Sequence, residues 1–402
     1  MIDPQLIRSH FPIFQRQAGL VYLDNAATTQ RPQTVIDRIS KFYSQENANI
    51  HRGLYAMSVG ATANYEGVRD RVKDFIGGKT RESIAFTRGA TEAINVVANS
   101  YVKPRMKAGD NVVISAMEHH SNLIPWQQIC LQKGAELRII PVDNSGELAV
   151  NKIADLLDHK TRMLAFTHIS NTLGTVNPVD QIVEIAHGKN VPVLIDAAQS
   201  ACFYPLEVEA IGCEFLAFSA HKMFGPFGVG VLYTDPELIE DMAPYNFGGG
   251  MITHVGFDES TFMTYPYNLE AGTGQIAEVI GLSAAIEYLK NIDKMEAIAY
   301  VSELASYFTE KLTGVKNAVT VGNPGNRTGI VSFLLDNIHP HDVATFLAEE
   351  NIALRAGHHC TQPLLELMGV KATLRVSFSV YNTKEEIDRM IDVLRKVQKF
   401  WS

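Results

Sequence analysis

Between about residues 20 and 265, short apolar runs alternate with stretches that have the pattern of helices. The runs are SIAFT, NVVISA, LRIIPV, RMLAFTHI, VPVLIDAA, FLAFSA and GVGVLY. Continuous apolar strands separated by helices are typical of βαβ units, in which helices cover both faces of a mostly parallel sheet. The sequence therefore predicts an α/β fold. One of its helices is predicted to start at Ser58 as N-cap and to end at Gly77-Gly78.

The pattern changes after this region. A long helical stretch is predicted over about 276–313, and short strands follow at AVTVGN, IVSFLLD, IALRAG and LRVSFSV. Further helices are predicted from about His341 and from Thr383. We therefore expect a large domain at residues 21–275 and a smaller α+β domain at residues 276–402. Residues 1–20 are expected to form a lead-in that packs on the small domain.

Composition narrows the possible partners. The 402 residues are 46% hydrophobic and 20% charged, as in an ordinary soluble globular protein with more than one core. A net charge of −9 argues against nucleic acid or an anionic membrane surface as the main partner. The N-terminal stretch MIDPQLIRSHFPIFQ has no secretory signal pattern, and no segment approaches the length of a membrane span. The cytoplasm is the expected location.

Lys222 lies in FLAFSAHKMFGPFGVGVLY, where an apolar run ends and a Gly/Pro loop begins. A strand end followed by glycines would place this amine at the mouth of the sheet. A desolvated lysine loses its proton more easily and becomes a nucleophile toward carbonyls. The cofactor pyridoxal phosphate (PLP) needs such an amine, because it is held as a Schiff base. Most lysines are surface residues, so the hypothesis depends on the other parts of a PLP site.

Two segments offer such parts. Asp196 ends the apolar run VPVLID, where it would keep the pyridine nitrogen of PLP protonated or, alternatively, would cap the next helix. The strand IAFT, the turn Arg88-Gly89-Ala90-Thr91-Glu92 and a following helix would supply backbone N–H groups and a hydroxyl to a phosphate. Taken alone, this turn is better explained by ordinary helix-start residues.

Histidines and a cysteine form two further motifs. In Glu118-His119-His120, adjacent histidine side chains diverge, so stacking on a cofactor ring is favoured over metal binding. Cys360 ends the segment RAGHHC, and nearby arginine and histidine would stabilise a reactive thiolate. The alternative, a Cys/His metal site, lacks a second ligand pair close in sequence. The other three cysteines, at positions 130, 202 and 213, lie in apolar surroundings and are expected in the core.

These segments together resemble the class V aminotransferase-fold PLP enzymes, and within them the cysteine desulfurase and selenocysteine lyase group with a short cysteine loop. The matching segments cover nearly the whole chain: YLDNAATTQRP, NIHRG, TRGATEAIN, MEHHSNLIPW, HISNTLGTVNP, LIDAAQS, FSAHKMFGPFGVGVLY, GGGMI, LEAGT, RAGHHCTQPLL and LRVSFSVYNT. The chain departs from the family pattern at Ala90, Ala220, Phe227 and Gly274-Gln275.

The resemblance implies fold type I of the PLP enzymes and a role for each matched position. Lys222 would carry PLP and remove a proton from the substrate. The ring of PLP would be held by Asp196 at its nitrogen, Gln199 at its phenolic oxygen and His119 stacked on its face. The phosphate would be held by Ala90, Thr91, Ser219 and His221, with Thr273 reaching in from the partner subunit of a homodimer. The substrate carboxylate would be held by Asn171 and Arg375, with His51 nearby.

The resemblance also implies the reaction. L-cysteine would be converted to L-alanine, and its sulfur would pass to Cys360 as a persulfide. An acceptor protein would then take the sulfur for iron–sulfur cluster assembly or other sulfur-dependent biosynthesis. Lyases acting on L-selenocysteine or cysteine sulfinate share this fold and remain alternatives. An alternative from another class is a non-enzymatic metal-binding protein that uses His358, His359 and Cys360; no metal is expected in the favoured interpretation.

Overall fold

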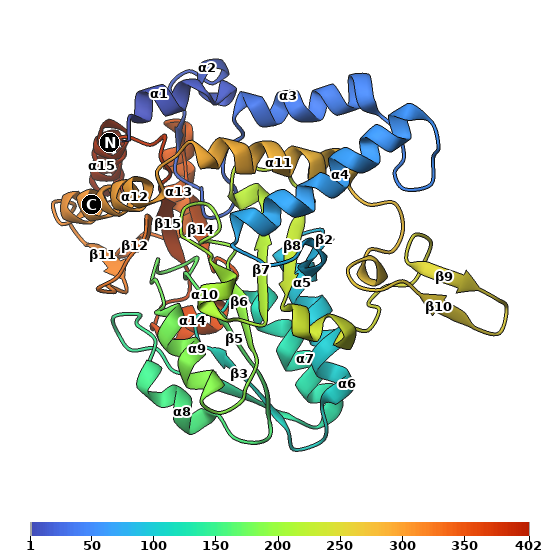
Figure 1. Ribbon diagram of the computed structural model, residues 1–402. Coiled ribbons are helices and arrows are strands. Elements are labelled where there is room, and N and C mark those ends of the chain that lie inside the picture. Colours follow the sequence, from blue (N-terminus) through green and yellow to red (C-terminus); the bar gives the residue numbers. More distant parts are fainter. Residues whose placement is uncertain (1, 402) are drawn as a thin grey trace.

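The computed structural model describes residues 2–401, and a seven-stranded sheet lies at its centre (Figure 1). The strand order is β2-β8-β7-β6-β5-β3-β4. The strands are β2 (Ile84–Thr87), β3 (Asn111–Ser115), β4 (Glu136–Ile140), β5 (Thr161–Thr167), β6 (Val193–Asp196), β7 (Phe215–Ser219) and β8 (Gly230–Thr234). Only β8 runs antiparallel to its neighbours in this sheet. The seven predicted strands and the mostly parallel sheet are confirmed.

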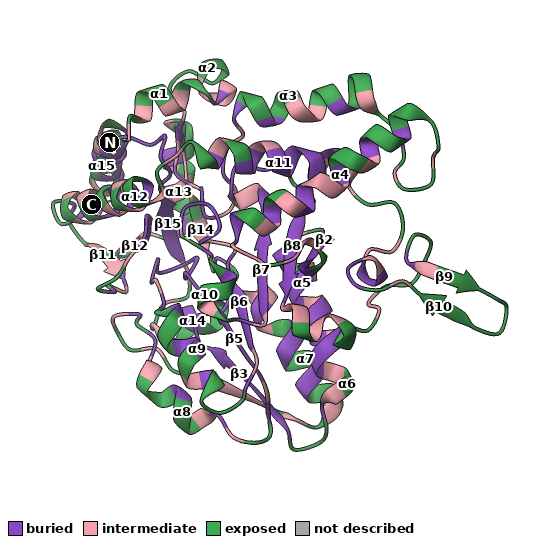
Figure 2. Ribbon diagram, viewed as in Figure 1, coloured by how far each residue is buried: buried purple, intermediate pink, exposed green. Residues whose placement is uncertain are grey.

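Helices cover both faces of this sheet, so the strands are buried on both sides (Figure 2). One face packs against α4 (Ala56–Phe75), α9 (Val179–His187) and α11 (Ile276–Lys290), and the other against α5 (Ala90–Val96) and α7 (Ile124–Lys133). Alternation along β3 shows the division, because Val113 joins the first core while Val112 and Ile114 join the second. Strands buried on both faces need continuous apolar sequence, which explains the runs in the chain.

Two helix predictions need correction. The stretch over 276–313 is not one helix but two, α11 and α12 (Lys294–Leu312), because the Asp293 side chain accepts the Glu296 N–H (2.9 Å) and starts a new helix. Ser58 is not the N-cap of α4, which begins at Ala56. Its hydroxyl instead donates to the Asn49 carbonyl (2.7 Å) and fastens the preceding loop to the helix.

A second, four-stranded sheet has the order β11-β12-β15-β14 and is wholly antiparallel. Its strands are β11 (Ala318–Val321), β12 (Ile330–Leu335), β14 (Arg355–Gly357) and β15 (Thr373–Ser377). It shares a separate core with α12, α13 (Pro340–Glu349) and α15 (Lys384–Trp401). The short strand β1 (Val21–Tyr22) pairs with β13 (Ile352–Ala353), so the chain passes through this core before it enters the large sheet.

The first helices also contact this part of the molecule. Helix α1 (Pro4–Ser9) carries Arg8, which forms an ion pair with Glu386 of α15 (2.7 Å). Phe11 is buried against Tyr381 and against Phe224, which follows Lys222 by two residues. The N-terminal segment therefore contacts both α15 and the loop that carries Lys222.

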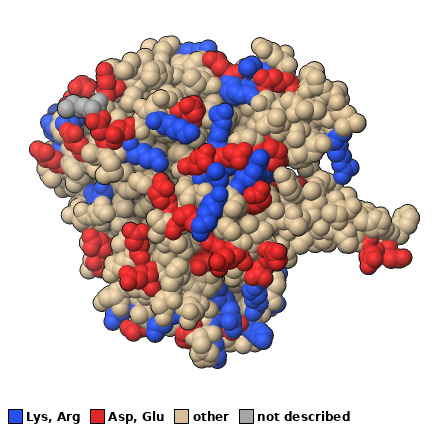
Figure 3. Space-filling model, in the orientation of Figure 1, with Lys and Arg blue, Asp and Glu red and all other residues tan. Residues whose placement is uncertain are grey.

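A hairpin of β9 (Ile252–Val255) and β10 (Ser260–Phe262) projects from the body as an arm (Figure 1). Phe247, Val255 and Phe257 are exposed on or beside it. In Figure 3 both signs of charge are interspersed over the visible face, whereas the arm is largely uncharged except near its end. Among residues 2–401, no helix is long and apolar enough to cross a membrane.

Candidate active site

Most of the predicted site residues lie at one edge of the large sheet, where the parallel strands end. Asp196 is the last residue of β6 and Ser219 the last of β7, while His119 and Asn171 each lie four residues beyond the ends of β3 and β5. Ligand sites of open α/β sheets form at the carboxyl ends of the strands. The fold therefore brings together residues that are distant in sequence.

Lys222 ends a 3₁₀ turn (Ala220–Lys222) directly after β7. Burial, together with the charges of Arg375 and Arg355, lowers the pKa of the Lys222 amine to about 8, while Asp196 and Cys360 act in the opposite direction. Asp196 is only 4% exposed, and burial raises its pKa, although the Ala198 N–H and Lys222 oppose this effect. The amine and the carboxylate are therefore both buried and act on each other electrostatically.

The turn at Gly89–Thr91 lies against the end of β7. The Ala90 N–H donates to the Ser219 hydroxyl (2.8 Å). A Cβ on Gly230 would lie 2.4 Å from the Gly89 Cα, so β8 can pass this close to the turn only because residue 230 is glycine. The predicted phosphate residues of the turn and of β7 are therefore neighbours in the structure.

His221 follows Ser219 by two residues, and its ring stacks on an aromatic side chain that the family pattern lacks. Its Nδ1 is buried and has no hydrogen-bond partner. The Phe227 ring stacks on the imidazole (centroids 5.3 Å apart), and the Arg31 guanidinium lies 4.8 Å from the Phe227 centroid. Burial lowers the pKa of His221 to about 4, and Lys222 and Arg31 add to this effect. A neutral imidazole nitrogen is thus left without a protein partner at the site predicted for a phosphate.

His119 is held by a residue to which the sequence assigned no role, Ser121. The Nδ1 of His119 accepts the Ser121 N–H (3.1 Å) and lies 3.0 Å from the Ser121 hydroxyl. That hydroxyl lies 2.6 Å from the hydroxyl of Thr91. Burial lowers the pKa of His119 to about 3, and the charge of Lys222 lowers it further, so the ring is neutral at pH 7.

The buried Glu118 anchors the loop that carries His119. Its carboxyl accepts the Thr167 N–H (2.9 Å) and the Asn122 amide (2.6 Å), and it contacts the Ser115 hydroxyl. Burial raises the pKa of Glu118 to about 8, an effect that these hydrogen bonds oppose. The site loop is therefore tied to β3 and β5 through one buried carboxyl group.

Cys360 is exposed, whereas the other three cysteines are buried as predicted. The backbone around it is fixed, because the Cys360 carbonyl accepts the His120 N–H (2.7 Å) and the His359 carbonyl accepts the Asn171 side-chain amide (2.8 Å). The backbones of His359 and Cys360 both have positive φ values, 52° and 57°, which residues other than glycine rarely adopt. The backbone of this loop is thus held against His120 and Asn171, and the thiol stays accessible.

Arg375 lies on β15 and is 2% exposed. It donates through Nη1 to the Asn171 carbonyl (3.0 Å) and through Nη2 to Asp24 (3.0 Å), while its buried Nε has no partner. Arg355 donates to the other oxygen of Asp24 (3.0 Å). Asp24 has no role predicted from the sequence, although it lies in the family-like segment YLDNAATTQRP. Asn171 and Arg375 are thus neighbours in the structure.

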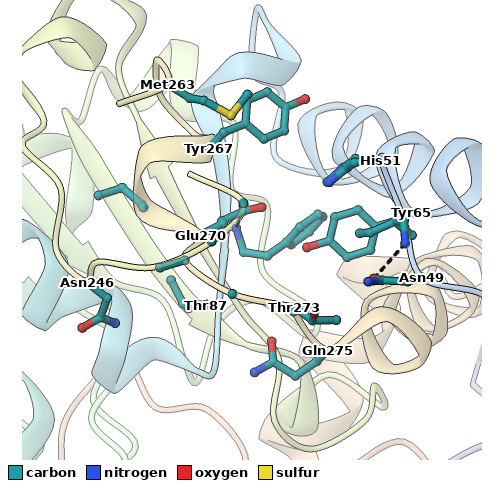
Figure 4. A pocket seen from close by; sticks show the side chains of 18 of the residues that line it. Asn49, His51, Tyr65, Thr87, Asn246, Met263, Tyr267, Glu270, Thr273 and Gln275 are labelled. Atoms are coloured by element: carbon teal, nitrogen blue, oxygen red, sulfur yellow. Dashed lines mark hydrogen bonds between the residues drawn. The ribbon is translucent and has the colours of Figure 1, made fainter. Parts of the chain in front are cut away.

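His51 and Thr273 lie in a hollow of about 660 Å³ whose lining does not include Lys222 (Figure 4). His51 is paired with Glu66 through Nε2 (2.9 Å). The loop that carries Thr273 is anchored by Glu270, which forms two bonds to the buried Arg69 (2.8 and 2.6 Å). The structure therefore places these two predicted residues together, on a surface beside the arm.

The residues at the sheet edge fit PLP. They supply a buried amine of lowered pKa, a buried carboxylate, and a buried imidazole nitrogen on His221 that has no protein partner. Gln199 also lies there, with its amide donating to the Ala26 carbonyl (2.8 Å). Within residues 2–401, no group of three or more His, Cys, Asp or Glu side chains is arranged to hold a metal ion.

Comparison with known proteins agrees with this geometry. The aminotransferase class-V family matches residues 21–390. A probable cysteine desulfurase from Halalkalibacterium halodurans is 44% identical over 398 residues, covering 98% of each chain. The crystal structure of the cysteine desulfurase CsdA from Escherichia coli, in an S-sulfonic acid form, superposes with a TM-score of 0.93 at 37% identity, covering 100% of this chain and 99% of that one. The apo cysteine desulfurase from Thermococcus onnurineus NA1 gives 0.94 at 35% identity, covering 99% of each chain.

Proposed function

The chain belongs to the aminotransferase class-V family and is a cysteine desulfurase that depends on PLP, and on this premise we propose which of its residues perform the reaction. Lys222 carries PLP, Asp196 pairs with the ring nitrogen, Gln199 bonds the phenolic oxygen and His119 stacks on the ring. Ala90, Thr91, Ser219 and His221 hold the phosphate. PLP bound there withdraws electrons from the bonds at the α-carbon of the substrate.

Lys222 also moves the substrate's α-proton. Its pKa of about 8 supports this role, because a base works best when its pKa lies near the working pH. Arg375 and the Asn171 side chain bind the carboxylate of L-cysteine. The buried, unpartnered Nε of Arg375 is the donor that this assignment uses. His119 is neutral at pH 7 and therefore adds no further positive charge beside the amine.

Cys360 receives the sulfur. Its thiolate forms an S–S bond to the substrate sulfur while the bond from that sulfur to the β-carbon breaks, and the electron pair of the broken bond stays on carbon. Protonation of that carbon gives L-alanine, so L-cysteine and one thiol become L-alanine and one persulfide without an external oxidant. The observation that carries this assignment is the exposed Cys360 thiol within electrostatic range of Lys222 and Arg375.

We also propose a cytoplasmic homodimer whose persulfide passes to an acceptor protein for iron–sulfur cluster assembly or other sulfur-dependent biosynthesis. The hollow that contains Thr273 and His51, together with the exposed apolar arm beside it, supports a subunit contact in this region. Thr273 would then reach the phosphate of the partner's site. The division into residues 1–20, 21–275 and 276–402 stays a prediction.

Substitution of the thiol tests the assignment. Cys360→Ala is expected to bind PLP, remain yellow and release no alanine from L-cysteine, while wild type forms alanine and a persulfide that mass spectrometry locates on Cys360. Cys130→Ala, at a buried cysteine of α7, is the matched control and should keep the persulfide. Full alanine formation by Cys360→Ala would contradict the assignment. L-selenocysteine and cysteine sulfinate are tried in parallel. Alanine formation from either by Cys360→Ala would indicate a lyase, because loss of the selenium or sulfinate group does not require the enzyme thiol.

A further inference from the structure

Three side chains form a continuous line from the Gly89–Thr91 turn to His119. The Thr91 and Ser121 hydroxyl oxygens are 2.6 Å apart, and the Ser121 oxygen lies 3.0 Å from the Nδ1 of His119. The same Nδ1 accepts the backbone N–H of Ser121 at 3.1 Å. Thr91 and His119 have assigned roles at the cofactor, whereas Ser121 has none.

The protons in this line can be counted. A backbone N–H can only donate, so Nδ1 of His119 is an acceptor and the proton of the neutral ring lies on Nε2. Two hydroxyl oxygens 2.6 Å apart must share one proton, which comes from either Thr91 or Ser121. Each hydroxyl has a single proton to donate. The direction of the Thr91–Ser121 bond therefore decides whether the Ser121 hydroxyl can also donate to His119.

We propose that Ser121 is a positioning residue that couples the occupancy of the phosphate site at Thr91 to the hydrogen bonding of His119. The inference rests on the proposed function, which places a phosphate at this turn. It adds a residue that acts through Thr91 and His119, the two side chains its hydroxyl contacts.

The coupling has two states. Without a phosphate, Thr91 donates to Ser121, and Ser121 donates to Nδ1 of His119, which then receives two donors. A phosphate accepts hydrogen bonds and does not donate them, so the Thr91 hydroxyl donates its hydrogen bond to a bound phosphate. Ser121 must then donate to Thr91, and Nδ1 keeps the backbone N–H alone. Phosphate binding therefore removes one hydrogen bond from the ring that stacks on the cofactor, which increases the electron density on Nδ1 and the freedom of the ring to turn.

Ring-nitrogen NMR tests the coupling on the full-length chain. Protein labelled with ¹⁵N in its histidines is loaded either with PLP or with pyridoxal, which lacks the phosphate, and the His119 signal is assigned by its loss in His119→Asn. In wild type, the Nδ1 resonance is expected farther downfield in the PLP form than in the pyridoxal form. Inorganic phosphate added to the pyridoxal form should move it to the PLP position.

Two substitutions separate the coupling from a merely structural role. Ser121→Ala should abolish the difference between the PLP and pyridoxal forms, and Ser121→Thr, which keeps a hydroxyl, should restore it. His120 is the internal control, because its Nε2 accepts the Gln362 N–H (3.2 Å) and should shift equally little in every form.

The two proposals fail differently. If both forms bind on Lys222 and the His119 resonance of wild type is the same in each, the coupling is wrong and the assignment of Lys222 stands. A difference that persists in Ser121→Ala also overturns the coupling. If borohydride fails to fix PLP on Lys222, the proposed function is wrong and this inference falls with it.

Discussion

Asp24→Asn is expected to destabilise the protein strongly, because Asp24 is the carboxylate that balances a fully buried arginine. Its two oxygens accept from Arg375 and Arg355, each at 3.0 Å. The Arg375 side chain is 2% exposed and that of Asp24 is 16% exposed, so water screens the pair little. The substitution keeps the shape and one acceptor oxygen but removes the negative charge.

The magnitude follows from burial and distance. Removing one partner of a buried ion pair costs about 3–5 kcal/mol, because the other charge is left uncompensated. Coulomb's law gives about 4 kcal/mol for unit charges 4 Å apart at an effective dielectric constant of 20. The asparagine oxygen retains part of one hydrogen bond, so we expect a loss of about 3 kcal/mol in the free energy of unfolding.

Urea unfolding, followed by far-UV circular dichroism, measures this loss. The matched control is Asp392→Asn, because Asp392 and Arg395 also lie 3.0 Å apart but are 68% and 48% exposed. Exposed pairs contribute about 0–1 kcal/mol, so this control should shift the transition little. The two substitutions change the same chemical group at the same distance and differ in burial.

A loss in Asp24→Asn as small as that of the control would refute the reasoning, since it would mean that the buried charge of Arg375 does not depend on Asp24. A double-mutant cycle strengthens the test. Arg375→Met removes the buried charge itself, so the double substitution should lose less than the sum of the two single losses. Strict additivity would show that the two side chains are not coupled.

Three further predictions follow from other buried groups. Burial raises the pKa of Glu118 to about 8, so wild-type stability should fall as the pH rises from about 5 to 8, because the unfolded carboxyl ionises there while the folded one stays protonated; Glu118→Gln should flatten this dependence. Glu270→Gln should lower the urea midpoint, because the buried charge of Arg69 loses the carboxylate that Glu270 supplies. Glu287→Gln, at a side chain that is 62% exposed, should leave the midpoint unchanged. Phe227→Ala should release PLP faster on dialysis, measured by absorbance, because it removes the ring stacked on His221; unchanged release would contradict the role of the stack.

The sequence predicts the sheet well because burial on both faces imposes one composition. All seven predicted strands exist, and the carboxyl ends of the six that run parallel to one another form one edge, so placing Asp196 and Lys222 there required only the topology. The break between α11 and α12 was missed for the opposite reason. Apolar residues continue at helical spacing on both sides of it, and the Asp293 cap is a one-residue signal that periodicity does not show.

The contacts that complete the site could not be predicted from local pattern. Asp24 and Arg375 are 351 positions apart, and Thr91 and Ser121 are 30 apart. Each pairing depends on how two segments meet in the folded chain. Asp24 and Ser121 both lie within segments that resemble the family. For Asp24 the available signal was that a buried arginine needs a carboxylate partner. Ser121, a small polar residue after two histidines, carried no such signal.

The balance of charge at the site is opposite in sign to the net charge of the whole chain. The chain has a net charge of −9, yet the groups that act on one another around the amine are the cations Lys222, Arg355 and Arg375, the carboxylates Asp24 and Asp196 and the Cys360 thiol. The three cations outnumber the two carboxylates before any ligand binds. A phosphate and a substrate carboxylate are anions, and each would offset part of the lowering of the Lys222 pKa, which burial causes and Arg375 and Arg355 increase. Ligand binding should consequently raise the pKa of this amine, so that Lys222 accepts the α-proton more readily once the substrate carboxylate has reached Arg375.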